Sequence, residues 1–155
     1  MEGVNDDFRD LLTALTSVEA RYLVVGAHAS AAHGHSGPTS DLELWVEASR
    51  ENAPRVLRAL EQFGAPPGPR AKDLQVPGLA FRLGAPPSRM QFLTKIAGLR
   101  FDEAWSRRVE AELAPGVKCH VLALADLIAS MRATGRARDL AEVTALERLR
   151  AKTLN

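Results

Sequence analysis

The sequence predicts an α/β protein, of the α+β kind, with a mixed sheet of about five to six strands flanked by helices. In the first half, short apolar runs alternate with segments of helical periodicity. In the second half, apolar runs come in pairs separated by turn residues, as in hairpins. The length of 155 residues fits one domain spanning 1–155, with the C-terminal helices at about 123–149 packed on it.

Helices in the first half are indicated by apolar residues three and four positions apart, and strands by short continuous apolar runs. Asp6 and Asp7 suit the first turn of the first helix, because its N-terminal end carries partial positive charge. Gly26 and Gly64 each end an element. The expected elements are a helix at 6–15, a strand at 22–25, a helix at 27–33, a turn at 35–40, a strand at 42–46 and a helix from Ser49 to 63.

Turn residues divide the second half of the chain. Three prolines and a glycine within 65–70 exclude regular structure, so we expect a surface loop there. Pro115 and Gly116 separate two apolar runs, which predicts a hairpin. The remaining expected elements are strands at 79–83 and 89–94, a helix at 101–107, strands at 109–113 and 118–122, and helices at 124–133 and 138–149.

Composition excludes several classes of protein. The 20 Lys and Arg residues nearly balance 19 Asp and Glu residues, which argues against a non-specific nucleic-acid binder but allows a local basic patch. The single cysteine, Cys119, cannot form an internal disulfide or a cysteine-based zinc cluster. No apolar segment approaches the roughly 20 residues that span a membrane. We therefore expect a cytoplasmic protein without a membrane partner.

Two acidic residues lie on one predicted strand. Asp41 and Glu43 are two positions apart, so they share a face, with Cα atoms roughly 6.5–7 Å apart. Leu42 and Leu44 would then face the core. Two acids on one face indicate contact with a cation, or simply a strand with one solvated face, which is common in antiparallel sheets.

The order of two motifs points to a family. Val25-Gly26-Ala27 precedes Asp41-Leu42-Glu43-Leu44, and this order resembles the nucleotidyltransferase superfamily related to polymerase β. Within it, the chain is similar to small bacterial domains akin to the toxin of the abortive-infection system. The segments that carry this resemblance, within residues 8–147, are RYLVVGAHASAAHG, SDLELWV, GAPPSRMQFLT, FDEAW and LADLIASMRATGRARDLAEV. The resemblance implies a nucleotidyltransferase fold.

The resemblance also implies a reaction, the transfer of a nucleoside monophosphate from a nucleoside triphosphate to a hydroxyl of a tRNA or protein acceptor. Asp41 and Glu43 would hold two Mg²⁺ ions. Backbone N–H groups at Gly26 and Ala27 would approach the phosphates. An antitoxin would be a further partner. The other residues expected near the nucleotide are His28, Ser40, Arg132, Arg136 and Arg138.

Three positions depart from the family pattern, all on the metal and phosphate side. Gln91 stands where relatives carry a third acid, and its uncharged amide cannot act as a general base. Glu43 stands where close relatives prefer Asp. Met131 stands where relatives often carry a Lys that reaches phosphate oxygens. Nearby arginines could replace that Lys or could simply form a solvated helix face.

Histidines near the glycine turn raise the question of a metal site. His28 and His33 are five apart, roughly 140° around a helix, so they do not share a face, and we do not expect them to form a zinc site with His35. A place for His28 beside the nucleotide is the expectation. Trp45 and Trp105 are expected to pack in the core or a groove, and Cys119 to be buried.

Two functions remain open from the sequence. The first is a metal-dependent nucleotidyltransferase, favoured by Asp41, Glu43 and the glycine turn. The second is a non-catalytic module that binds a nucleotide or a protein partner, favoured by Gln91 and Met131. We therefore expect catalytic activity to be lost or sharply reduced.

Overall fold

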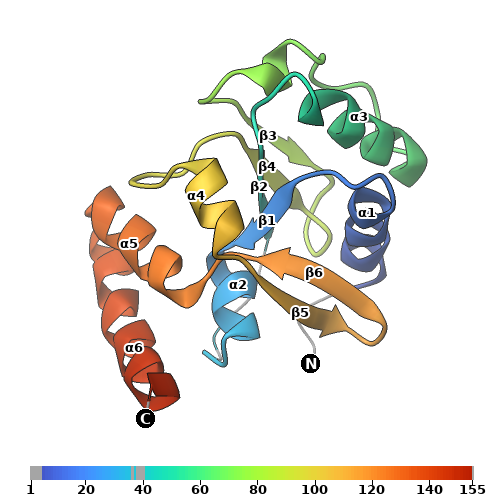
Figure 1. Ribbon diagram of the computed structural model, residues 1–155. Helices are drawn as coiled ribbons and strands as arrows, with labels where there is room; N and C mark the ends of the chain where they lie inside the picture. Colours follow the sequence, from blue (N-terminus) through green and yellow to red (C-terminus); the bar gives the residue numbers. More distant parts are fainter. Residues whose placement is uncertain (1–4, 36, 38–40, 155) are drawn as a thin grey trace.

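A computed structural model describes residues 5–35, 37 and 41–154 (Figure 1). Its helices and strands alternate along the chain much as the sequence predicts. In order they are α1 (Asp6–Ser17), β1 (Tyr22–Val25), α2 (Gly26–Ala32), β2 (Leu42–Val46), α3 (Asn52–Phe63), the 3-10 turn η1 (Asp73–Gln75), β3 (Ala80–Leu83), β4 (Met90–Leu93), α4 (Phe101–Ser106), β5 (Val109–Ala114), β6 (Val117–Val121), α5 (Leu124–Thr134) and α6 (Ala137–Leu154).

The strands form one six-stranded sheet in the order β3-β4-β2-β1-β6-β5. The pairs β1–β6 and β2–β4 are parallel, and the pairs β1–β2, β3–β4 and β5–β6 are antiparallel. This confirms the predicted mixed sheet and its two hairpins. Figure 1 shows α1 and α3 on one side of the sheet and α4, α5 and α6 on the other.

The boundaries of some elements differ from the predicted ones. The last helix continues to Leu154 rather than ending at 149, because no glycine or proline interrupts it. Helix α3 begins at Asn52 rather than directly after Ser49, although the Ser49 hydroxyl does accept a hydrogen bond from the Asn52 N–H at 3.0 Å. The predicted turn at 35–40 lies mostly outside the described residues.

The strand β2 presents different residues to the two faces of the sheet. Leu42 and Leu44 are fully buried on one face of the strand, as predicted. Glu43 and Trp45 lie on the other face, under α4 and α5. Cys119 on β6 is buried, and burial raises the pKa of its thiol to about 11, so the thiol is protonated near neutral pH. No helix in the described part of the chain is long and apolar enough to cross a membrane.

Candidate functional site

A cleft of about 570 Å³ opens where the glycine turn, β2, β4 and the α5–α6 corner meet. It brings together residues that are more than 100 positions apart in the sequence. The sequence-predicted site residues that line it are Gly26, Ala27, Asp41, Glu43, Gln91, Arg136 and Arg138. Met131, buried on α5, also lines this cleft.

The sheet register explains why these residues meet. Glu43 is the antiparallel partner of Val25, the last residue of β1, and the parallel partner of Gln91 on β4. Its side chain therefore lies between the glycine turn and Gln91. Gln91 thus occupies the position next to the acid pair that the resemblance assigns to a third acid.

Glu43 lies directly against the glycine turn. Gly26 has φ of 69°, and a Cβ added to it would overlap the Glu43 carboxylate, lying 2.8 Å from its Cδ. A side chain at position 26 is thus disfavoured twice, by the left-handed backbone conformation and by the lack of space. The carboxylate occupies the part of the turn where the resemblance expects a phosphate to approach.

Asp41 has a partner that the sequence patterns did not reveal. The Arg89 Nε donates to Asp41 Oδ2 at 2.8 Å, and the Asp41 side chain is only 16% exposed. Arg89 is two residues before Gln91, so the alternation that places Gln91 on this face also indicates Arg89. This charge-assisted bond ties one of the two acids of the predicted pair to a cation.

Burial and neighbouring charges change the pKa values of two acids in the cleft. Burial raises the pKa of Glu43, and the nearby Asp41 carboxylate raises it further, while Arg136 and Arg138 lower it. Burial also acts to raise the pKa of Asp139, but hydrogen bonds from Thr134 and Arg136 outweigh it and hold that pKa below its usual range. Glu43 is therefore the costliest charge in the cleft to maintain.

The lining of the cleft carries equal numbers of cations and carboxylates: Arg82, Lys95, Arg136 and Arg138 against Asp41, Glu43, Asp139 and Glu142. Three of the carboxylates have a basic partner, because Asp41 is bound by Arg89, Asp139 is bound by Arg136 at 2.7 Å, and Glu142 lies 3.5 Å from His35. Within the described residues, the side chains of three of the cations form no hydrogen bond or ion pair: Arg82, Lys95 and Arg138. They come from β3, from the segment after β4 and from α6, and these unpaired cations favour an anionic ligand.

Three of the predicted ligand-contacting residues are not placed at the cleft. His28 is fully buried, with its ring edge-on to Phe8 at 5.5 Å, because it lies on the side of α2 that faces α1. Arg132 points toward α6, where it pairs with Glu147. Ser40 lies outside the described residues.

The donor set does not fit the two Mg²⁺ ions that the resemblance implies. Of the acid pair, Asp41 is bound to Arg89, and the third position carries the neutral amide of Gln91. Across residues 5–35, 37 and 41–154, no group of three or more His, Cys, Asp or Glu side chains is arranged to hold a metal ion.

Two comparisons with known proteins found no match to this chain. No protein-family model matches this chain, and no curated protein matches it in sequence. The case for a function therefore depends on the geometry and charge of the cleft and on the motifs described above.

Proposed function

We propose that this chain is a nucleotidyltransferase-like domain that binds the phosphates of a nucleotide in the Glu43 cleft and does not transfer nucleotides. The observation that carries the proposal is the neutral Gln91 beside an acid pair whose Asp41 is bound by Arg89. A nucleotidyltransferase-like domain with this arrangement would have a cleft for a nucleotide but too little negative charge in it to hold two metal ions.

Phosphate binding is supported by the cations that converge on the cleft. Arg82, Lys95 and Arg138 supply strong donors for phosphate oxygens, and the guanidinium groups can bind them in a bidentate manner. The volume of about 570 Å³ lies within the usual range for small-molecule sites. Glu43 opposes an anion, which limits the affinity.

Loss of catalysis is supported by the same residues. An attacking hydroxyl needs a base, and the amide of Gln91 cannot accept its proton. The apolar Met131 supplies no charge where relatives often place a Lys. An intact enzyme of this class would carry out transfer to a tRNA or protein with Mg²⁺. The retained acids Asp41 and Glu43, both lining the cleft, are the one feature that favours this second candidate.

Transfer is tested with each labelled nucleoside triphosphate, Mg²⁺ or Mn²⁺, and total RNA or protein as acceptor. We expect no more labelled product from this chain than from its Asp41→Ala variant. Robust labelling that disappears in the Asp41→Ala variant would refute the proposal and show that the chain is an active nucleotidyltransferase.

A second experiment asks whether restoring the acids restores metal binding. The double variant Glu43→Asp, Gln91→Asp restores three acids, and we expect it to bind Mn²⁺ at least about tenfold more tightly, because a third carboxylate joins the donor set. Gln62→Asp, on the exposed surface of α3, is the matched control and should leave metal binding unchanged. Equal Mn²⁺ affinity in the parent and the double variant would show that Gln91 is not the missing ligand.

A further inference from the structure

A second and larger cleft, of about 900 Å³, adjoins the first. The strand β2 leads from one cleft to the other. Asp41 and Glu43 line the first, and Trp45 and Glu47, two and four positions further, line the second. Lys95 lines both clefts, so it marks their junction.

Two aromatic residues, Trp45 and Phe101, line the second cleft, and a third, Trp105, packs on Phe101. Phe101 lines the cleft, with its ring edge-on to Trp45 at 5.0 Å and stacked on Trp105 at 5.8 Å. Trp45 is 2% exposed, and its indole N–H has no hydrogen-bond partner among the described residues. A buried donor without a partner is costly, and a ligand with an acceptor atom would relieve that cost.

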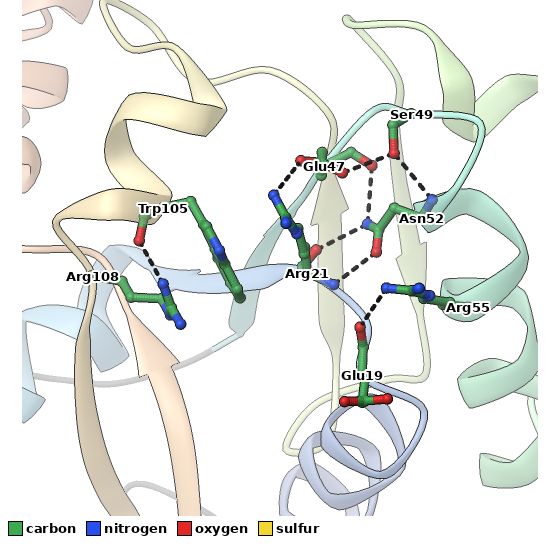
Figure 2. Close-up of polar contacts among 8 residues, drawn as sticks. All are labelled: Glu19, Arg21, Glu47, Ser49, Asn52, Arg55, Trp105 and Arg108. Carbon is green, nitrogen blue, oxygen red and sulfur yellow. Dashed lines mark hydrogen bonds and ion pairs between the residues drawn. The ribbon is translucent and has the colours of Figure 1, made fainter.

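A network of hydrogen bonds connects the polar residues at the rim of the second cleft, as Figure 2 shows. Glu47 accepts hydrogen bonds from Arg21 at 3.3 Å and from Ser49 at 2.8 Å. The side chain of Asn52 bonds the backbone of Arg21 and Glu47 through three hydrogen bonds. A preorganised rim lowers the entropic cost of binding a ligand.

The charged groups of this rim divide into bound and unbound ones. Glu47 is engaged by Arg21 and Ser49, as above, and Arg55 donates to the Glu19 carbonyl oxygen at 3.2 Å. The side chains of Lys95 and Arg100 form no ion pair or hydrogen bond within the described residues. Exposed Glu51 and Asp102 also line the cleft and partly offset these cations.

We infer that the second cleft holds the base of the nucleotide whose phosphates lie in the first cleft. A nucleobase is planar, stacks on aromatic rings and carries ring-nitrogen or carbonyl acceptors along its edge. Phe101 supplies the aromatic surface and the Trp45 N–H a donor. Lys95, at the junction, lies where the sugar–phosphate part would pass. This inference rests on the proposed function, because the phosphates fix which end of the ligand enters which cleft.

The separation of the two clefts agrees with the size of a nucleotide. Glu43 and Trp45 are two positions apart on one strand, which places their Cα atoms roughly 7 Å apart. A ligand that contacts both Glu43 and Trp45 therefore extends along β2 by about the length of a ribose.

The test compares ligands with and without a base by calorimetry. The probes are the four nucleoside triphosphates and inorganic tripolyphosphate. We expect at least one nucleoside triphosphate to bind at least about tenfold more tightly than tripolyphosphate, since stacking adds to the phosphate contacts. If every nucleoside triphosphate binds no better than tripolyphosphate, the base site is refuted and phosphate binding stands. If no probe binds, the proposed function itself fails, and the base site with it.

A matched pair of variants locates the base. Phe101→Leu should reduce the affinity for the preferred triphosphate to that for tripolyphosphate, whose own affinity should not change. Phe81→Leu is the control: the Phe81 ring stacks on Phe92 and lines a third cleft. This substitution should change neither the affinity for the triphosphate nor the affinity for tripolyphosphate. Undiminished triphosphate binding by a folded Phe101→Leu protein would overturn the inference.

A measurement on the unmodified chain covers the case in which Phe101→Leu fails to fold. The chain has two tryptophans, and both contact Phe101. Tryptophan fluorescence should therefore change on saturation with the preferred nucleoside triphosphate and stay constant with tripolyphosphate. The same response to both ligands, or no response to a nucleoside triphosphate that calorimetry shows to be bound, would contradict a base beside Phe101.

Discussion

Asn52→Ala is expected to lower the free energy of unfolding by about 3 kcal/mol, a large fraction of the total stability of a single domain. Asn52 is 1% exposed and joins three parts of the fold. Its side chain accepts from the Arg21 N–H at 2.7 Å and donates to the carbonyl oxygens of Arg21 and Glu47, both at 3.0 Å. The substitution removes all three part-buried bonds and takes the side-chain partner from the Arg21 N–H and the Glu47 carbonyl oxygen, while the Arg21 carbonyl oxygen keeps its bond from the Glu47 N–H at 3.2 Å.

Asn5→Ala is the matched control for this prediction. Asn5 caps α1 by accepting from the Phe8 N–H at 2.9 Å, and its loss should cost about 1 kcal/mol, the usual effect of removing an N-cap. Urea unfolding of both variants gives the two differences in free energy. An Asn52→Ala protein no less stable than Asn5→Ala would show that Asn52 does not hold the rim of the second cleft.

Gly26→Ala is expected to cost about 2–3 kcal/mol of stability, for two separable reasons. The φ of 69° places an L-residue in the left-handed region, which costs roughly 1–2 kcal/mol. The added Cβ would also overlap the Glu43 carboxylate, so that side chain has to leave its position against the turn. Thermal or urea unfolding measures the total.

Two further variants separate these contributions. Gly116, in the turn between β5 and β6, has φ of 79° with nothing within 4 Å of an added Cβ, so Gly116→Ala reports the backbone cost alone, about 1 kcal/mol. In a Glu43→Ala background, Gly26→Ala should lower the free energy of unfolding by no more than Gly116→Ala does, because the clash with the Glu43 carboxylate is gone. An excess that persists without Glu43 would contradict the placement of the carboxylate against the turn.

Much of the fold could be predicted because the local signals agree with one another. The apolar face of α1 and the hairpins on either side of 84–87 and 115–116 all follow from residue spacing and turn residues. Strand alternation also places Glu43 toward the cleft and Leu42 and Leu44 toward the core. These features depend on a few neighbouring residues, which is the range over which sequence patterns carry structural information.

The order of the strands and several site contacts could not be predicted. Pairing of β2 with both β1 and β4 is set by packing between distant segments. The Arg89–Asp41 bond spans 48 positions, and although alternation places Arg89 on the same face as Gln91, no local pattern indicates which residue it binds. His28, expected beside the nucleotide, is buried and does not line the cleft, because the helix rotation that brings Ala27 to the cleft turns His28 toward α1.

The proposed function requires that the Glu43 cleft binds nucleotide phosphates without the help of metal ions, because cationic side chains and not Mg²⁺ supply the positive charge. The decisive experiment is calorimetry of the unmodified chain with nucleoside triphosphates, once with Mg²⁺ and once with a chelator. We predict that the preferred triphosphate binds in the chelator at least as tightly as in Mg²⁺, and that Arg138→Ala weakens binding at least about tenfold in both conditions. Binding that requires Mg²⁺, or no binding in either condition, would refute metal-independent binding of phosphates in this cleft.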